Sequence, residues 1–346
     1  KFMNSIRINK DSKIFIFCPN GLVTGGPEAL HQLRFYMEQE GYQAYLVYEF
    51  SGNLNPPERY MEYEPKVVSF QQVTDDKRNV LIVPEVSIGI LQVYHSIQKC
   101  VWFLSWGYYD ISVKDRLLIG CKNIVKRFFN CFIFDPERKF RLQIFSRRKQ
   151  KNVLYCCGSE YAYQHVVSDL KVSDAVMLVE PISMDFLREG PAKNLTSCGR
   201  GDIVLYNPSK PSEVMRKLLE RTDIQFQPLK GYTPVELIEI YRKSKLYIDF
   251  GQFGGPERIP KESVYNGTCL LVGRRNAAEN DFDVAIPGAF KIGDFENVDA
   301  IADRIRDMLL HYDDLIGEFA HFRNKIDNLE QNFKEQIRSI FLMQEE

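Results

Sequence analysis

The sequence predicts an α/β fold of two domains, each built around a mostly parallel sheet. The chain has 346 residues, and at roughly 150 residues per domain this length fits two of them. Hydrophobic residues make up 45% of the chain, which is enough to fill a core in each domain. Short apolar runs alternate with amphipathic stretches along the whole chain, and this alternation is typical of βαβ units.

The first domain is predicted to span residues 1–180. Its apolar runs have the length of buried strands, and the stretches between them repeat apolar residues at helical spacing. The expected strands are residues 13–18, 44–48, 80–84, 100–106, 152–157 and 175–179, and the expected helices are residues 27–40, 88–97 and 161–169.

Residues 181–200 are rich in proline, glycine and polar residues without a clear period, so we expect a linker there. A second domain, residues 201–346, follows and ends in packing helices over residues 298–343. Because ligands of parallel sheets bind beyond the carboxyl ends of the strands, we expect the two domains to face a cleft that holds a two-part substrate. The expected strands are residues 203–206, 225–228, 246–250 and 269–272, and the expected helices are residues 212–220, 234–243 and 260–266.

Charge and hydropathy exclude several classes of protein. The 45 lysines and arginines balance 46 aspartates and glutamates, so the chain lacks the net positive charge of a nucleic-acid-binding protein. No apolar run approaches the ~20 residues of a membrane-spanning helix, and the first residues lack a signal-peptide core. The eight cysteines show no CxxC spacing, which favours free thiols. We therefore expect a cytoplasmic protein with no nucleic-acid partner.

The tetrapeptide Gly-Gly-Pro-Glu occurs once in each half, at residues 25–28 and 254–257, and each copy precedes an expected helix. Glycines let a ligand approach the backbone, and a helix N-terminus offers unpaired N–H groups and partial positive charge. The pattern predicts that Gly25, Gly26, Gly254 and Gly255 contact a phosphate. Two ordinary strand-to-helix turns would give the same tetrapeptides.

Charged residues follow the second copy closely. Three glycines between positions 251 and 255 predict an open loop, and Pro260 is expected to begin a short helix that ends at Gly267. Arg258 and Lys261 could neutralise a diphosphate, and Glu262 could accept hydrogen bonds from ribose hydroxyls. A cluster of surface salt bridges is the alternative interpretation of these three side chains.

This arrangement resembles the GT-B glycosyltransferases, and within them the glycogen-synthase-like retaining branch. That branch carries two glutamates eight positions apart, followed by a glycine and an apolar strand. Glu262, Gly267 and the strand at residues 269–272 resemble the second part of the motif, which implies that Glu262 binds ribose. The first glutamate differs, because Gly254 stands eight positions before Glu262 and the nearest acid is Glu257. The sugar-binding role falls to Glu257 or to Arg258.

The resemblance implies further donor-binding residues. Family members carry cations for the diphosphate after the first strand of the second domain, where this chain has Lys210, and Gly25 and Gly26 match a Gly-Gly turn in the first domain. An exposed turn lysine is the alternative for Lys210. Arg274 and Arg275 add cations at the same sheet edge.

Catalysis in such a site needs neither a cofactor nor a metal, because fixed cations can stabilise the departing diphosphate. We expect Arg258 and Lys261 to do so, with Glu28 acting from the first domain. Asp281 and Asp283 match a metal-binding DxD pattern but lie in a polar stretch that favours a solvated loop. Four side chains remain candidates for a general base, which leaves the stereochemistry open. They are Glu28, His95, Glu160 and His165.

Residues 122–151 carry ten cations and two acids among six phenylalanines. This composition favours peripheral contact with an anionic membrane or a lipid-linked acceptor, and a solvated helix pair is the alternative. The sequence thus predicts transfer of a sugar from a nucleotide-sugar donor to a glycan or lipid-linked acceptor, in surface-polysaccharide biosynthesis at the inner face of the membrane. A non-catalytic binding module and a nucleotide-sugar epimerase are the alternatives.

Overall fold

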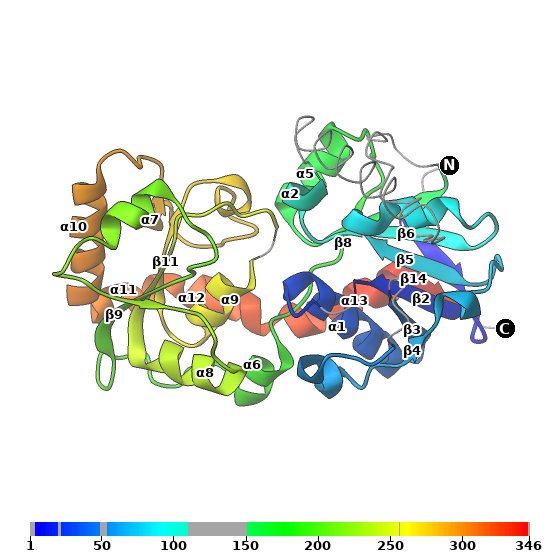
Figure 1. Cartoon of the computed structure of the whole chain (residues 1–346), viewed down its shortest axis with the longest axis horizontal. Helices are drawn as coiled ribbons and strands as arrows, with labels where there is room; N and C mark the ends of the chain where they lie inside the picture. Colours follow the sequence, from blue (N-terminus) through cyan, green and yellow to red (C-terminus); the bar gives the residue numbers. More distant parts are fainter. Residues whose placement is uncertain (1–3, 20–21, 49–53, 110–150, 256, 345–346) are drawn as a thin grey trace, which may run out of the picture. The chain divides into compact units, whose positions relative to one another are not determined.

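The computed structural model describes residues 4–19, 22–48, 54–109, 151–255 and 257–344 (Figure 1). The chain divides into two compact units. The first contains Lys1–Glu180 together with Gln331–Glu346, and the second contains Pro181–Glu330. Each unit is built on its own parallel sheet.

The sheet of the first unit has seven strands in the order β4-β3-β2-β5-β6-β7-β8, and every pair is parallel. The order reverses between β2 and β5, and a reversal of this kind is where open α/β sheets usually bind ligands. The strands are β2 (Lys13–Cys18), β3 (Gln43–Tyr48), β4 (Val67–Val68), β5 (Val80–Pro84), β6 (Gln98–Phe103), β7 (Val153–Cys157) and β8 (Val176–Met177). The helices include α1 (Gly25–Gln39), η1 (Glu58–Tyr63), η2 (Phe70–Gln72), η3 (Glu85–Gln92), α2 (Trp106–Tyr109) and α5 (Glu160–Ser168).

Side-chain alternation along β2 explains why this sheet is covered on both faces. Ile14 and Ile16 point into one apolar cluster, which also contains Leu30 and Leu33 of α1. Phe15 and Phe17 point into a second cluster on the opposite face, with residues of β5, η3 and α5. A strand buried on both faces appears in the sequence as a continuous apolar run, which is the pattern that predicted this element.

The C-terminal residues belong to the first unit, whereas the sequence assigned residues 201–346 to the second domain. Helix α13 (Leu329–Ile340) places Phe333 and Ile337 in the apolar cluster beside α1, and the Phe333 ring stacks on Trp102 at 5.9 Å between centroids. Strand β14 (Phe341–Met343) then pairs in parallel with β1 (Ile6–Ile8). Burial of this apolar face accounts for the return of the chain, and helical periodicity alone cannot say which core receives it.

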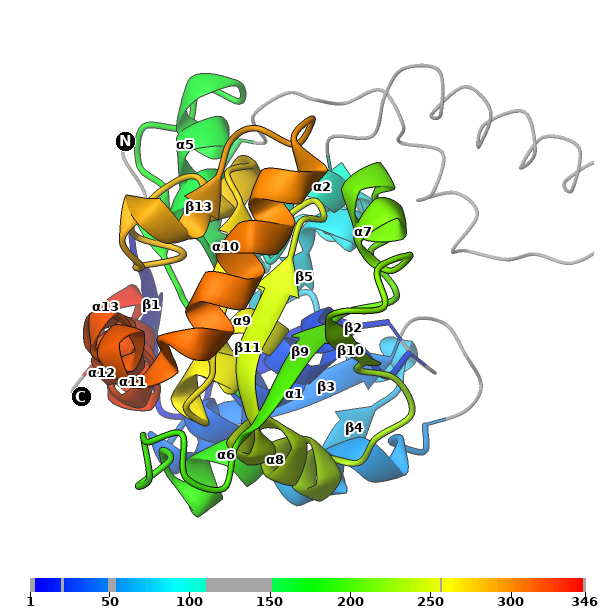
Figure 2. The same cartoon turned by 90° about the vertical axis from the view of Figure 1, so that its left-hand side faces the viewer.

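The second unit has a five-stranded parallel sheet in the order β10-β9-β11-β12-β13. Figure 2 shows β9 and β11 side by side, with α7 and α10 next to them. The strands are β9 (Gly201–Tyr206), β10 (Gln225–Pro228), β11 (Ser244–Asp249), β12 (Cys269–Gly273) and β13 (Lys291–Ile292). The helices include α6 (Met184–Glu189), α7 (Glu213–Leu218), α8 (Pro234–Lys243), α9 (Arg258–Tyr265), η4 (Asn276–Ala278), η5 (Gly288–Phe290), α10 (Val298–Leu310), α11 (Tyr312–Leu315), η6 (Ile316–Phe319) and α12 (Ala320–Asp327).

Two segments differ from their sequence-based predictions. The expected linker, residues 181–200, contains α6 and is packed into the second unit, because the Arg200 guanidinium donates to the carbonyl oxygens of Tyr241, Ser244 and Asn266. The helix expected at residues 88–97 is instead η3, whose backbone is not helical at Ser87. A 3₁₀ helix has about three residues per turn, so over a segment this short its apolar pattern resembles that of an α-helix.

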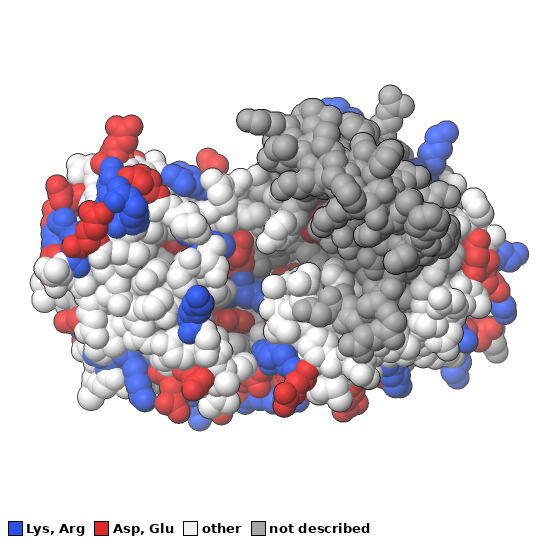
Figure 3. All heavy atoms as spheres, viewed as in Figure 1, with Lys and Arg blue, Asp and Glu red and all other residues white. Residues whose placement is uncertain are grey.

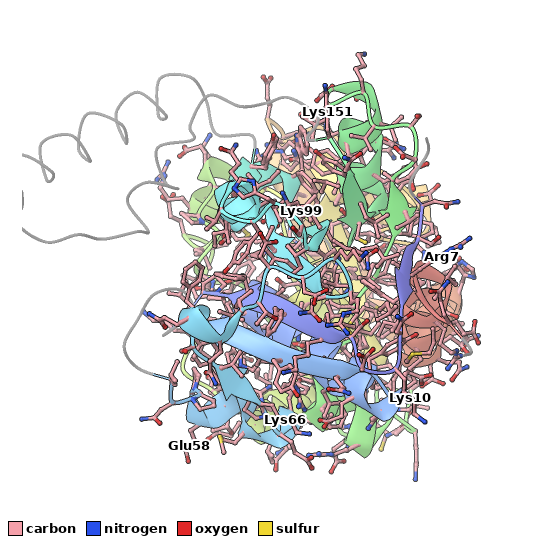
Figure 4. All side chains as sticks on the ribbon, turned by 90° about the vertical axis from the view of Figure 1, so that its right-hand side faces the viewer. Arg7, Lys10, Glu58, Lys66, Lys99 and Lys151 are labelled. Atoms are coloured by element: carbon pink, nitrogen blue, oxygen red, sulfur yellow. The ribbon has the colours of Figure 1, made fainter. Side chains whose placement is uncertain are left out.

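The basic segment, residues 122–151, lies outside the described residues except for Lys151. Lys10, Lys66, Lys99 and Lys151 lie apart from one another on the first unit (Figure 4). Acidic and basic side chains are interspersed on the face of the second unit seen in Figure 3. Within the described ranges, no helix is long and apolar enough to cross a bilayer. The predicted membrane contact therefore stays a prediction.

Gly267 offers a test of how the second unit is held together. Its φ is +87°, and a Cβ there would lie 2.3 Å from Nη2 of Arg200. We expect Gly267→Ala to lower the free energy of unfolding by about 2–4 kcal/mol, since it combines backbone strain with disruption of buried hydrogen bonds. Urea unfolding of the whole chain measures the change.

Gly317→Ala is the matched control. In the described part of the chain, no atom lies within 4 Å of a Cβ added at Gly317, and this residue is not among the glycines with positive φ. Its variant should remain within about 0.5 kcal/mol of the parent. Equal effects of the two substitutions would contradict the assigned role of the Arg200 contacts.

Candidate functional site

A pocket of about 510 Å³ lies at the carboxyl edge of the sheet in the second unit. Its walls come from the segments that follow β9, β11, β12 and β13, which parallel pairing brings to the same edge. This is the edge at which open α/β sheets bind ligands. The lining residues are Pro211, Ser212, Glu213, Val214, Lys217, Gly251, Gln252, Arg275, Phe295 and Glu296.

Lys210 lies beside this pocket, in contact with the lining residue Gly251. A Cβ at Gly251 would lie 2.8 Å from Cβ of Lys210, so only glycine lets the two segments come this close. The Lys210 ammonium is 2.9 Å from Oε2 of Glu257 and 3.7 Å from Oδ2 of Asp249, and it sits 4.5 Å from the centre of the Phe253 ring. The structure thus brings together two predicted donor-binding residues, Lys210 and Glu257.

Asp249 lies beside Lys210 and Glu257, and the sequence analysis did not identify it as a candidate site residue. It is the last residue of β11 and its side chain is 3% exposed. Tyr247 Oη donates to Oδ2 at 3.0 Å, and the backbone N–H of Gly251 donates to Oδ1 at 2.9 Å. The available signal was an acid that ends a buried apolar strand, where desolvation is costly unless the carboxylate has partners.

Glu257 lies at the end of the glycine-rich loop and precedes the first residue of α9. Desolvation raises the pKa of its carboxyl, while the Lys210 ammonium and the backbone N–H of Gly254 act in the opposite direction. Gly254 and Gly255 belong to the loop that ends at Glu257, and the backbone of Gly254 contacts the Glu257 carboxyl group. Their contact with a phosphate stays a prediction.

Arg258, Lys261 and Glu262 lie on α9, and Ser183 joins two of them. Ser183 Oγ accepts a hydrogen bond from Nη1 of Arg258 and donates one to Oε1 of Glu262, both at 3.2 Å. Lys261 and Glu262 are 4% and 5% exposed, so neither forms the surface salt-bridge cluster that the sequence left open. The helix begins at Arg258 and not at Pro260 as expected, and its C-terminal Gly267 has the positive φ of a helix stop.

The two arginines after β12 have different environments. The Arg275 guanidinium stacks on Phe295, with Cζ 3.8 Å from the ring centre, and both side chains line the pocket. Phe295 packs so closely on the backbone that a Cβ at Gly273 would be 2.8 Å from it. Arg274 is exposed, and its Nη2 donates to the carbonyl of Gly288 at 3.4 Å. Only Arg275 is placed to contact a ligand in this pocket.

The DxD pattern at Asp281 and Asp283 is occupied by local contacts. Asp281 pairs with the Lys291 ammonium at 2.8 Å, which lowers the pKa of its carboxyl, and its side chain is 86% exposed. Asp283 accepts a hydrogen bond from the side-chain amide of Asn280 at 2.8 Å. Across the described parts of the chain, no group of three or more His, Cys, Asp or Glu side chains is arranged to hold a metal ion.

In the first unit, the Gly-Gly-Pro-Glu copy forms the first turn of α1, directly after Thr24. The Tyr60 hydroxyl accepts from the Thr24 N–H at 2.9 Å and donates to the Thr24 carbonyl at 3.0 Å. Among the residues that the structure describes, the nearest atom to a Cβ at Gly26 would be Cδ1 of Leu104, at 3.9 Å. Packing of the described residues therefore does not require glycine there, and its contact with a ligand stays a prediction.

Glu28 is held against η1 by two contacts. Tyr63 Oη donates to its Oε1 at 2.7 Å, and the Arg59 guanidinium lies 3.5 Å from the same oxygen. Glu28 is 7% exposed. These contacts connect η1 to the N-terminal turn of α1, and the catalytic role predicted for Glu28 stays a prediction.

The other candidate bases occupy varied environments. His165 stacks on Trp106 at 4.9 Å between ring centres and contacts Asp169 at 2.9 Å, His95 is exposed, and Glu160 is half-buried. Sequence reasoning missed Glu85, the residue directly after β5. Its carboxyl is 4% exposed and accepts from the Leu104 N–H at 3.0 Å, and burial raises its pKa to about 7. Its position directly after a buried strand could have identified Glu85 from the sequence.

No protein-family model matches the sequence, and no curated protein is significantly similar to it. Solved structures are similar in fold. Anabaena Alr3699/HepE in complex with UDP superposes with a TM-score of 0.59 at 9% identity, over 95% of this chain and 98% of that one. T4 phage BGT in complex with UDP and Mn²⁺ gives 0.56 at 11% identity, over 95% and 99% of the two chains.

WaaG, a glycosyltransferase involved in lipopolysaccharide biosynthesis, gives a TM-score of 0.55 at 9% identity, over 95% of this chain and 99% of that one. TarM is a longer protein, of which this chain covers 56% at a TM-score of 0.53. These neighbours share the GT-B fold of two Rossmann-like domains. The chain therefore has the GT-B fold, and the predicted fold class is confirmed.

His31 of α1 gives the first unit a testable pH dependence. Its Nδ1 is 2.7 Å from the Pro27 carbonyl and its Nε2 is 2.9 Å from Tyr48 Oη, and burial lowers its pKa from 6.5 to about 4. Because the folded pKa is depressed, the unfolded chain binds the extra proton between these values. Stability from neutral His31 is complete above pH 6.5 and is lost as the pH falls towards 4, by up to about 3 kcal/mol.

Urea unfolding of the parent chain and of His31→Gln at several pH values between 7 and 4.5 measures this contribution. The stability difference between them should shrink as the pH falls. His95→Gln is the control, since His95 is exposed and its variant should follow the parent at every pH. A pH-independent difference for His31→Gln would contradict the neutral, buried state of this histidine.

Proposed function

We propose that this chain is a glycosyltransferase that takes a sugar from a nucleotide-sugar donor. The observation that carries the proposal is the pocket at the carboxyl edge of the second sheet, with Lys210 beside it, in a chain with the GT-B fold. Fold alone does not define activity, so the argument rests on the chemistry of this edge. A concave site with a stacked guanidinium and a neighbouring ammonium group suits an aromatic base linked to phosphates.

In the proposed donor complex, the base enters the pocket beside Arg275, and the diphosphate lies against Lys210 and the loop with Gly254 and Gly255. Arg258, which is half-buried near the start of α9, stabilises the diphosphate as it departs. Each such group could contribute roughly 2–4 kcal/mol to transition-state stabilisation.

Lys261 and Glu262 have a different place in the proposal, because both are more than nine-tenths buried. Glu262 binds ribose if the donor reaches the side of α9 that carries Ser183, and otherwise positions Arg258 through that serine. Gly25 and Gly26 are proposed to contact a phosphate or the acceptor, as the resemblance implies. Glu28 is proposed as a catalytic group.

The acceptor proposed is a glycan or a lipid-linked sugar in surface-polysaccharide assembly, and the reaction proposed needs no metal. Support for the acceptor comes from the fold similarity to WaaG, which acts in lipopolysaccharide biosynthesis. A similar fold has been solved with Mn²⁺ as well as UDP, so the assays below are made with and without a divalent cation. DNA belongs in the acceptor panel because BGT is a DNA-modifying enzyme.

Isothermal titration with UDP, ADP, GDP and their glucose conjugates tests donor binding. We expect at least one nucleoside diphosphate to bind, and Lys210→Met to weaken its affinity about tenfold or more, since loss of a charged hydrogen bond costs about 1.5–3 kcal/mol. Lys230→Met is the control, because Lys230 is an exposed lysine of the same unit that does not line the pocket.

Turnover then separates transfer from the alternatives. Product analysis with an acceptor panel should show sugar transfer that depends on the donor. A protein that binds donors without turning them over would be a binding module, and isomerised donor without acceptor would indicate an epimerase. Absence of binding to every nucleoside diphosphate would refute the proposed function.

A further inference from the structure

Lys210 has two carboxylate neighbours, so the negative charge around its ammonium group exceeds the positive charge. The ammonium lies 2.9 Å from Glu257 and 3.7 Å from Asp249, so one positive charge faces two acidic groups. A diphosphate binding beside the same ammonium would meet both carboxylates. Like charges that share one counter-ion repel each other, so both carboxylates would oppose the binding of the diphosphate.

The two acids differ in how they are held. Asp249 belongs to the end of a strand, is 3% exposed, and accepts hydrogen bonds from Tyr247 and from the backbone of Gly251. It would retain these two partners if the lysine were absent. Asp249 is therefore a fixed part of the sheet edge.

Glu257 belongs to the loop and is less enclosed. Its side chain is 27% exposed, and it lies on the loop that carries Gly254 and Gly255. It is also the nearer of the two acids to the ammonium, with the geometry of a direct ion pair. A carboxylate at this distance takes the place that a phosphate oxygen would need in order to bind Lys210.

The geometry points to Glu257 as a resident counter-ion that a diphosphate displaces from Lys210, while Asp249 remains and positions the ammonium. This inference rests on the proposed function and adds the exchange of one anion for another at the donor site. Binding then requires breaking the pair between Lys210 and Glu257, so the measured affinity is lower than the contacts with the diphosphate alone would give. Glu257 would thus limit how tightly the product nucleoside diphosphate is held.

The test compares four variants by isothermal titration at constant ionic strength and pH, with UDP, ADP, GDP and inorganic pyrophosphate as probes. Pyrophosphate reports on the diphosphate subsite without involving a base. Glu257→Gln keeps the shape of the side chain but removes its charge. We expect it to tighten binding of pyrophosphate and of the preferred nucleoside diphosphate by about threefold to fivefold, which is the upper scale of a partly exposed ion pair.

Glu279→Gln is the matched control for the loss of one negative charge. Glu279 is an exposed acid of the same unit that does not line the pocket, and its variant should bind within about twofold of the parent. In a Lys210→Met background, Glu257→Gln should no longer tighten binding. Thermal unfolding of each variant verifies that the chain is folded.

The outcomes separate this inference from the proposed function. If the parent binds a nucleoside diphosphate and Lys210→Met weakens it, but Glu257→Gln binds like the parent or more weakly, the displacement is refuted and the proposed function stands. Equal tightening by Glu257→Gln and Glu279→Gln would reduce the effect to net charge and refute the displacement as well. If neither the parent nor Glu257→Gln binds any nucleoside diphosphate, both proposals fail.

Discussion

Parallel pairing of the strands is the constraint on which the candidate site depends. In a parallel sheet every strand ends at the same edge. Segments that are far apart in sequence therefore lie side by side there, whether or not their side chains interact. Lys210 follows β9, Asp249 ends β11 and Arg275 follows β12. These three side chains come from a span of 66 positions, and sheet register alone brings them to one edge.

Tight packing then fixes the positions that register leaves free. Gly251 and Gly273 both follow or end central strands, and a Cβ at either would lie 2.8 Å from a neighbouring side chain, Lys210 in one case and Phe295 in the other. Close packing of Lys210 against Gly251 helps to position its side chain. Close packing of Phe295 against Gly273 positions the ring on which Arg275 stacks. Gly251 and Gly273 thus leave the space that Lys210 and Phe295 occupy, which a larger residue at either position would fill.

Periodicity and residue type made much of the fold predictable. Residues 80–84, 225–228 and 234–243 were expected with the bounds they have, since a buried strand and a capped amphipathic helix each have a strong local pattern. The glycine-rich loop was expected from its three glycines, and Lys210 was expected after a strand from the family resemblance. Their contacts with a ligand stay predictions. Ser183 was missed for a physical reason, because its partners Arg258 and Glu262 lie far along the chain and only the fold brings them together. Asp249 was missed although its position at the end of an apolar strand was visible in the sequence.

The return of the chain to the first unit shows a further limit of local patterns. The apolar stripe of α13 has the same 3.6 period as that of α10, yet Phe333 and Ile337, together with Ile340 and Phe341, complete a core whose other members precede position 180. The cluster holds residues of β1, β2, α1 and β6, so the last residues of the chain fill a space that the first residues leave open. Hydrophobic burial requires only a complementary surface and has no preference for neighbours in sequence. It follows that the residues which complete the core of the first unit are separated from the rest of that core by the whole second unit.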